Sequence, residues 1–358
     1  MKKVRVAIIG LGHIHTMGML AAFSKNENSE IVGIAEYGEY TEEQLQFNLS
    51  HHIPGDMNPE LYRDYKELLK QDIDVAVICT GVNEHVEAVE ETLGLGIHTI
   101  IEKPMALTMD EAKRMYRAYK ASSAQLMINW PIAWIPCFRK VKELADSGIV
   151  GDILRVEYRS PATCGPYDRD AMTPQEFSKL WWYQHDEGGG AIPDYAGYGC
   201  VLTTWLTGCT AKRVSGFRKN FLMPFADIED YATFTIDFGS CMGLIEASWS
   251  TQSNGEIPTG PIVYGTEGTI TADRFGVDVK VYKDSDRYRP SCEPTEVYTF
   301  EDKVNGVADN MVDYILNGTP LFEMTTPEFN IKAMAAFDAG RRSCESGNIE
   351  TAYDPFEL

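Results

Sequence analysis

Short apolar runs alternate with longer amphipathic stretches over the first 125 residues of the chain. The apolar runs are rich in β-branched residues and cover Val4–Ile9, 31–35, 75–79 and 99–101. Between and after them, residues 84–95 and 109–120 have the spacing of surface helices, the second with a capping-box pattern at Thr108 and Glu111. This alternation predicts a parallel sheet covered by helices. Leu126–Asn129 is one further predicted strand, at the start of a second domain.

The pattern changes after residue 125. A helix is predicted over 138–147, followed by extended segments, several of which alternate apolar and polar residues: 153–159, 231–238, 242–249, 262–264, Thr269–Ala272, 277–282 and 296–300. Such alternation is typical of an antiparallel sheet with one covered face. Two more helices are predicted over 304–316 and 327–345. We therefore predict an α/β protein with two domains, 1–125 and 126–358, the second built on a large, mainly antiparallel sheet.

Charge and composition narrow the range of partners. The 358 residues include 32 Lys and Arg against 53 Asp and Glu, a net charge of -21, which repels nucleic acid and anionic membranes. No stretch approaches the roughly 18 apolar residues of a membrane span, and the first apolar run is interpreted as a buried strand. The eight cysteines form no CxxC pair, which favours reduced thiols and a cytoplasmic location. We expect no nucleic-acid or membrane partner.

A glycine turn follows the first predicted strand and precedes a helical run. Gly10 allows the tight turn, and Gly12 lets the backbone approach a pyrophosphate at the helix N-terminus. We assign Gly10, Gly12, His13 and Ile14 to dinucleotide binding. His15 stands where the third glycine of the fingerprint is expected. The alternative is a turn with a structural role alone.

Two further segments are candidates for the cofactor site. Glu36 closes the second predicted strand, where a carboxylate accepts hydrogen bonds from a ribose and disfavours the extra phosphate of NADP. NAD is therefore the predicted cofactor, and a solvated glutamate is the alternative. Thr80, Asn83 and His85 follow the strand 75–79, at the sheet edge where ligands bind. His85 could equally cap the next helix. The seven histidines show no metal-binding spacing, so we predict no metal.

Lys103, Asp194 and Tyr198 are the candidate catalytic residues. Lys103 ends a strand within Glu102-Lys103-Pro104, and the other two follow a run of three glycines at 188–190. To act as a base at pH 7, an ordinary phenol with a pKa near 10 must first ionise, which costs roughly 4 kcal/mol of free energy. The Coulomb attraction of an ammonium about 4 Å away stabilises the phenolate by about 4 kcal/mol at an effective dielectric of 20. Lys103 could thus make Tyr198 a competent acid and base, or could itself polarise the carbonyl oxygen while Tyr198 relays the proton. The alternative is a packed aromatic at a site without chemistry.

These motifs together resemble the Gfo/Idh/MocA oxidoreductase superfamily, over nearly the whole chain. The resemblance rests on Gly-Leu-Gly-His, residues 80–85, Glu102-Lys103-Pro104 and the glycines before Asp194. It implies an N-terminal Rossmann domain, a C-terminal α/β domain with an open sheet, and a homodimer or homotetramer formed through that sheet. It also implies nicotinamide-dependent redox chemistry on sugars, polyols or related secondary alcohols, with a catalytic Lys103 and with Glu102 and Lys103 in the cofactor site. Pro104 in that group often follows a cis peptide.

The chain departs from the family pattern at one catalytic position. Most members carry histidine where this chain has Tyr198, but members similar to glucose–fructose oxidoreductase and the dimeric dihydrodiol dehydrogenases have tyrosine. Their usual glycine two residues earlier is Ala196 here, with Gly197 next, so the local backbone is expected to differ.

Aromatic and polar residues flank the predicted site and suit the apolar face of a sugar ring. We assign substrate contacts to Trp130, Trp134, Tyr158, Trp182, His185 and Asp194, and weaker ones to Arg159 and the loop 164–169. The alternative for the aromatics is a place in the core. Together with these residues, the resemblance implies an NAD-dependent oxidoreductase acting on a secondary alcohol of a sugar, glycoside, polyol or cyclitol. A glycoside-cleaving enzyme that retains NAD and a non-catalytic cofactor-binding regulator are the alternatives.

Overall fold

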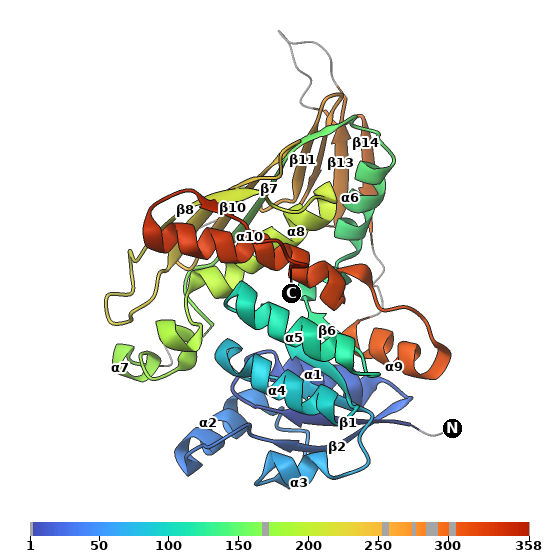
Figure 1. Cartoon of the computed structure of the whole chain (residues 1–358), viewed down its shortest axis with the longest axis vertical. Helices are drawn as coiled ribbons and strands as arrows, with labels where there is room; N and C mark the ends of the chain where they lie inside the picture. The colour runs from blue at the N-terminus through green and yellow to red at the C-terminus, as the bar shows by residue number, and fades with distance from the viewer. Residues whose placement is uncertain are drawn as a thin grey trace. The chain divides into compact units, whose positions relative to one another are not determined.

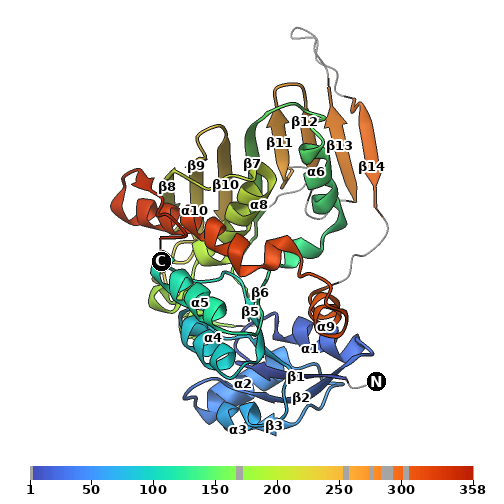
Figure 2. The same ribbon diagram turned by 45° about the vertical axis from the view of Figure 1, so that its right-hand side comes forward.

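The computed structural model describes residues 3–166, 172–252, 258–273, 277–283, 293–300 and 306–357. The chain forms two compact units, drawn in Figures 1 and 2. The first runs to Trp130 and also takes in a later segment that ends at Ile331, and the second begins at Pro131. The first unit extends past the predicted boundary at 125 because strand β6 (Leu126–Asn129) pairs with β5 (His98–Glu102).

The first unit contains a six-stranded parallel sheet. Its order is β3-β2-β1-β4-β5-β6, with β1 at Val4–Ile9, β2 at Ser29–Ala35, β3 at Leu61–Tyr62 and β4 at Val75–Ile78. The connecting helices are α1 (Thr16–Lys25), α2 (Glu42–His52), α3 (Tyr65–Leu69), α4 (His85–Gly94) and α5 (Met109–Ala121). This is the doubly wound Rossmann order, which binds ligands beside the carboxyl ends of β1 and β4. The predicted parallel sheet is confirmed.

Local signals explain which helices the sequence revealed. The capping box at α5 is present, with the backbone N–H of Glu111 donating to Thr108 Oγ1 at 3.3 Å and the N–H of Thr108 donating to Glu111 Oε2 at 2.9 Å. In contrast, α2 buries only Leu45 and His52, so its sequence carries little apolar periodicity and we did not predict it.

The second unit is built on a nine-stranded sheet. Its order is β14-β13-β12-β11-β7-β10-β9-β8-β15, and every adjacent pair is antiparallel except β7 with β10. The strands are β7 (Ile153–Pro161), β8 (Arg213–Lys219), β9 (Tyr231–Asp237), β10 (Met242–Ser248), β11 (Ile262–Gly265), β12 (Thr269–Ala272), β13 (Asp278–Tyr282), β14 (Glu296–Thr299) and β15 (Glu350–Thr351). The predicted mainly antiparallel sheet is confirmed.

Helices α6 (Pro136–Asp146), α8 (Gly197–Thr207) and α10 (Pro327–Ser346) lie along one face of this sheet (Figure 2). Gly199 of α8 sits so close to β10 that a Cβ there would lie 2.4 Å from Ile245 Cγ2. On the other face, Arg159 and Glu246 form a two-pronged ion pair with N–O distances of 2.9 and 3.1 Å. The sheet is therefore covered on one face and open on the other among the described residues.

Several elements were not predicted or lie partly outside the described residues. Helix α8 is buried on nearly every side, so it lacks the apolar–polar alternation that marks a surface helix. Helix α9 (Val307–Asn317) corresponds to the prediction over 304–316, whose first residues lie outside the described ranges. The loop 164–169 also extends beyond them. Within the described ranges, no helix has both the length and the apolar character that a membrane crossing needs.

Candidate functional site

The glycine turn after β1 is shaped by a close approach to the segment after β4. Gly10 has φ +76°, and a Cβ on it would lie 2.3 Å from Thr80 Cγ2 and 2.9 Å from the Thr80 backbone nitrogen. Its own N–H donates to the Ala35 carbonyl at 2.8 Å. Helix α1 begins at Thr16, and no side chain caps its first N–H groups at His15. The Thr16 N–H donates to the His13 carbonyl at 3.0 Å, so the N–H groups of the residues that follow it in the first turn are the ones that suit a phosphate.

We expect Gly10→Ala to abolish dinucleotide binding and to lower the free energy of unfolding by about 2–4 kcal/mol, because backbone strain and overpacking add. NADH titration and thermal unfolding measure the two effects. Gly94→Ala in α4 is the matched control, since a Cβ at Gly94 meets nothing within 4 Å. Equal NADH affinity in the two variants would contradict this interpretation of the turn.

His15 links the glycine turn to the end of β5. Its Nδ1 lies 2.8 Å from Glu102 Oε2, and Asn129 Nδ2 donates to Glu102 Oε1 at 2.8 Å. Burial, the largest influence, raises the pKa of Glu102, but His15, Asn129 and Lys103 outweigh it and lower that pKa overall. Glu102 is therefore a buried carboxylate held in its charged form. The residue in the third glycine position thus joins the glycine turn to the end of β5, directly before Lys103.

His13 belongs to the same network. Its Nδ1 accepts the N–H of His15 at 3.1 Å, and its ring meets that of His15 edge-on at 4.6 Å between centroids. Burial first, and then the charges of His15 and Lys103, lower the pKa of His13 well below its ordinary value. His13 is therefore neutral at pH 7.

His13, His15 and Glu102 place potential metal-ligand atoms within 4.8 Å of one another. The sequence did not suggest this group, because Glu102 is remote in the chain from the two histidines. The atoms already bond within the group, His15 to Glu102 and His13 to the backbone of His15. We interpret the cluster as a hydrogen-bond network and retain the prediction of a metal-free site.

Lys103 is buried at the end of β5, with 2% of its surface exposed. The Lys103–Pro104 peptide is cis, as the resemblance suggested. His85 lies within 3.4 Å of the Met105 carbonyl through its Nδ1, which must donate to that oxygen. Burial lowers the pKa of His85 to about 4, so its ring is neutral at pH 7. His85 thus bonds to the segment after Lys103, and α4 begins without a side-chain cap, which excludes the capping alternative.

Glu36 follows β2 and is 7% exposed, so it is not the solvated glutamate of the alternative interpretation. Its Oε2 accepts the N–H of Leu11 at 2.9 Å, and its Oε1 accepts Asn48 Nδ2 at 2.7 Å. Burial raises the pKa of Glu36, and these two hydrogen bonds partly oppose that shift. The carboxylate therefore holds the glycine turn directly. Thr80 is buried beside that turn, and Asn83 is exposed.

Asp194 and Tyr198 come from adjoining segments of the second unit. Asp194 lies in a π-helical stretch, Ile192–Ala196, that leads into α8 at Gly197. Its Oδ2 accepts the indole N–H of Trp249 at 2.9 Å, a contact that the sequence did not reveal. Tyr198 is 2% exposed in the first turn of α8. A π-helical turn is rare and is frequent at functional sites.

The structure divides the aromatic candidates into core and partly exposed residues. Trp130 is 2% exposed, and its indole N–H donates to Asn330 Oδ1 at 2.6 Å. Trp182 is equally buried and stacks on Trp181, while Tyr158 packs under α6 against Phe138. These three have the core placement of the alternative interpretation. Trp134 and His185 are partly exposed, and Trp134 lies under the Arg139 guanidinium at 5.7 Å.

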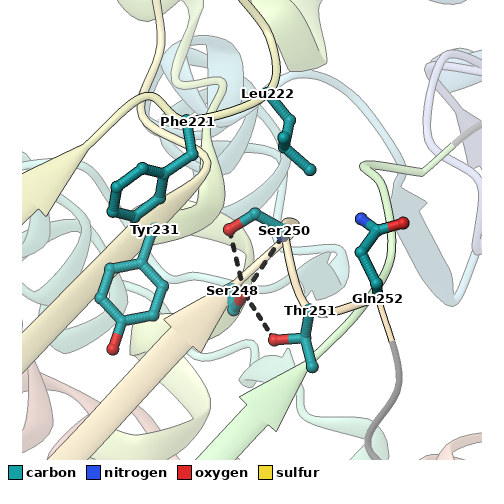
Figure 3. Close-up of a pocket in the computed structure, with 7 residues that line it drawn as sticks. All are labelled: Phe221, Leu222, Tyr231, Ser248, Ser250, Thr251 and Gln252. Carbon is teal, nitrogen blue, oxygen red and sulfur yellow. Dashed lines mark hydrogen bonds between the residues drawn. The ribbon is translucent and has the colours of Figure 1, made fainter.

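One cavity of about 290 Å³ lies at the end of β10 in the second unit (Figure 3). The rings of Phe221 and Tyr231 lie on one side of it and Gln252 on the other, with hydroxyl groups between them. Ser248 Oγ lies 2.8 Å from Thr251 Oγ1 and 3.4 Å from Ser250 Oγ. Trp249, between two of these lining residues in sequence, is the partner of Asp194. The accessible lining of the cavity is mainly apolar, and its hydroxyl groups bond to one another.

The glycine turn, the acid after β2 and the Rossmann strand order define the first unit as a dinucleotide-binding domain. Two family models match the chain. The oxidoreductase family with an NAD-binding Rossmann fold matches residues 4–130, and the GFO/IDH/MocA C-terminal domain matches residues 138–271. The chain therefore belongs to the Gfo/Idh/MocA family of oxidoreductases, as its motifs indicated.

Similar proteins of this family carry names of sugar and cyclitol dehydrogenases. The scyllo-inositol 2-dehydrogenase (NAD(+)) of Bacillus subtilis (strain 168) is 22% identical over 276 residues, 75% of this chain and 73% of that protein. The D-xylose 1-dehydrogenase (NADP(+)) of Haloarcula marismortui is 26% identical over 202 residues, 56% of this chain and 53% of that protein. The oxidoreductase P35 of Formosa agariphila is 27% identical over 162 residues, 45% and 48% respectively. The chain thus spans about half the length of the first curated relatives it matches.

Solved structures share the fold over nearly the whole chain. The aldose-aldose oxidoreductase of Caulobacter crescentus, complexed with glycerol, is 20% identical with a TM-score of 0.75, covering 98% of this chain and 100% of that one. The WlbA dehydrogenase of Bordetella pertussis, in complex with NADH and UDP-GlcNAcA, is 20% identical with a TM-score of 0.75, covering 99% and 100%. At this identity the likeness shows the fold alone.

Proposed function

We propose that this chain is an NAD-dependent oxidoreductase that removes a hydride, reversibly, from a secondary alcohol carbon of a sugar, glycoside, polyol or cyclitol. The observation that carries the proposal is the buried Lys103 at the carboxyl end of β5, joined through Glu102 and His15 to the glycine turn. A buried ammonium next to a dinucleotide-binding turn is suited to polarising a substrate oxygen.

The residues have distinct roles in this proposal. Lys103 polarises the substrate oxygen, and Tyr198 takes or returns the hydroxyl proton. Asp194, held by the indole of Trp249, orients the substrate hydroxyl. The proposal assigns Lys103 and Tyr198 to the same hydride-transfer step. His13 and His85 are both neutral at pH 7, so neither adds positive charge near the glycine turn.

NAD would supply the hydride acceptor, and the first unit has groups to hold it. Gly10 keeps free the space beside Thr80 that a Cβ would fill. The first N–H groups of α1 suit a pyrophosphate, and the carboxylate of Glu36 suits an adenosine ribose. Of the four acceptor positions on a carboxylate, Leu11 and Asn48 use two, so Glu36 retains capacity for a ribose hydroxyl.

Glu36→Gln should shift the preference from NAD toward NADP. Two unit charges about 5 Å apart repel by about 3 kcal/mol at an effective dielectric of 20, so removing the carboxylate charge should improve NADPH affinity relative to NADH by about 10²-fold. Dissociation constants from nicotinamide fluorescence give this ratio. Glu42→Gln is the matched control, because Glu42 pairs with Arg63 at the surface and carries the same charge. An unchanged ratio in Glu36→Gln would remove Glu36 from cofactor selection.

The substrate class rests on the second unit and on the relatives. The cavity of Figure 3 offers aromatic rings and hydroxyl groups, and the names of similar proteins include inositol and xylose dehydrogenases.

We further propose a homodimer or homotetramer through the open face of the nine-stranded sheet. A reducing cytoplasm suits the seven described cysteines, all of which are free thiols.

An NADH absorbance screen tests the proposed function. The purified chain is given NAD with myo-inositol, scyllo-inositol, D-xylose, D-glucose and methyl glycosides, and we expect at least one to produce NADH. Tight NADH binding without turnover on any of them would favour a cofactor-binding regulator. Cleavage of a methyl glycoside without net NADH would favour a lyase.

A further inference from the structure

Glu229 is a buried carboxylate in the second unit with no part in the proposed chemistry. It is 4% exposed and immediately precedes Asp230 and strand β9. Both its backbone and its side chain bond to the segment that carries Asp194: the Ala191 N–H donates to the Glu229 carbonyl at 3.0 Å, and the Ile192 N–H donates to Glu229 Oε1 at 2.8 Å. The carboxylate therefore meets the start of the π-helical stretch Ile192–Ala196.

The glycines before this stretch are shaped to admit Glu229 and Trp182. Gly190 has φ +109°, and a Cβ on it would lie 2.3 Å from Glu229 Oε1. A Cβ on Gly189 would lie 2.4 Å from the Trp182 carbonyl oxygen, which also accepts the Gly190 N–H at 3.0 Å. The second and third glycines of the run thus let two fixed groups approach the backbone closely. The Asp194 N–H in turn donates to the Gly190 carbonyl at 3.3 Å.

The charge on Glu229 has a neighbour of opposite sign. Arg218 of β8 places Nη1 3.7 Å from Glu229 Oε2. Burial, the largest influence, raises the pKa of Glu229, whereas the backbone bonds, Arg218 and His185 oppose that shift. A buried carboxylate is costly unless it is hydrogen-bonded and paired, and here both conditions are met at the segment that leads to Asp194.

We propose that Glu229 is a positioning residue: by binding Ile192 and filling the space above Gly190, it sets the place of Asp194 and of the turn that leads to Tyr198. Its catalytic consequence rests on the proposed function, but its structural consequence does not. The indole N–H of Trp249 donates to Asp194 Oδ2, so the resonance of that N–H reports where Asp194 lies, with or without turnover.

The experiment compares Glu229→Ala with Glu229→Gln in the full chain labelled with ¹⁵N-tryptophan, the Trp249 indole signal being assigned from Trp249→Phe. Glutamine retains an oxygen that accepts the Ile192 N–H, whereas alanine does not. We expect the indole signal to move in Glu229→Ala and to stay near its original position in Glu229→Gln. Asp338→Ala is the matched control, because Asp338 is also a buried carboxylate paired with an arginine, Arg342 of α10.

If the chain turns over a substrate, Glu229→Ala should lower kcat by roughly 10²-fold, the usual effect of a displacement of about 1 Å at a reacting group. The NADH dissociation constant should be unchanged, since the glycine turn lies in the first unit. Glu229→Gln should recover most of kcat. If Glu229 had only a stabilising role, Glu229→Ala would lower the thermal midpoint and the active fraction without moving the Trp249 indole signal.

Gly190→Ala approaches the same contact from the other side. Its methyl group would collide with the Glu229 carboxylate, so it should shift the Trp249 signal as Glu229→Ala does. The double variant Glu229→Ala/Gly190→Ala lacks the collision. Its fold-loss in kcat should therefore be smaller than the product of the two single fold-losses. An indole signal unmoved in folded Glu229→Ala would overturn the proposal. If the chain proves to have no turnover, the indole measurement still decides the role of Glu229, independently of the proposed function.

Discussion

Lys103→Met should bind NADH as the natural chain does and lose about 10²–10⁴-fold in kcat, the range that positioned proton-transfer groups contribute. Methionine retains a long, flexible side chain in a pocket where Lys103 is 2% exposed, so the fold should persist. The loss arises because no ammonium remains to polarise the substrate oxygen. Steady-state kinetics with the substrate from the screen, together with NADH titration, measure both quantities.

Retained binding is essential to that prediction. The groups assigned to NAD, from Gly10 to Glu36, keep their contacts when Lys103 is changed, and Glu102 keeps His15 and Asn129 as partners. A variant with near-normal kcat would remove Lys103 from the mechanism. Lost NADH binding together with lost kcat would instead assign Lys103 to the cofactor site.

Tyr198→Phe is expected to lower kcat by a similar factor, about 10²–10⁴-fold, because the ring remains but the hydroxyl that exchanges the substrate proton is removed. Tyr195→Phe is the matched control. The Tyr195 ring lies 6.1 Å from that of Tyr198, in the adjoining π-helical stretch, and this variant loses the same hydroxyl from a residue without an assigned role.

The two catalytic variants also test each other. Groups that act in one proton transfer are not additive, so Lys103→Met/Tyr198→Phe should be little slower than either single variant. Multiplicative losses would show that Lys103 and Tyr198 serve separate steps. Full activity in Tyr198→Phe would favour the interpretation of Tyr198 as a packed aromatic.

The sequence predicted the elements whose local pattern matches their burial. Strands β1 and β4 are almost continuously apolar because helices cover the parallel sheet, and β9 and β10 alternate because one face is open. Helix α8 was missed because it is buried on nearly all sides, so Tyr198 had no helical pattern around it. Periodicity reveals a half-buried element but not a wholly buried one.

The candidate site could be predicted only in part, for a related reason. Motifs identify residues whose chemistry repeats at short spacing, such as Gly10 and Gly12 or Asp194 and Tyr198. The partners that hold them come from remote segments: Asn129 and His15 for Glu102, Asn48 for Glu36, and Trp249 for Asp194. No local spacing marks a tryptophan that donates to a carboxylate 55 residues away. Trp130 and Trp182 have suitable chemistry, but only the structure shows that they are buried.

The transfer of deuterium tests the central claim most directly. The chain is incubated with NAD and either D-xylose deuterated at C1 or myo-inositol deuterated at C2, the positions in the names of two relatives, and with the deuterated form of any other substrate from the screen. Mass spectrometry of the reduced cofactor follows the label. The account predicts deuterium on the nicotinamide ring with the natural chain, and a rate about 10²–10⁴-fold lower with Lys103→Met. Bound NAD that never acquires deuterium from any substrate, or label transfer that is equally fast in Lys103→Met, would contradict it.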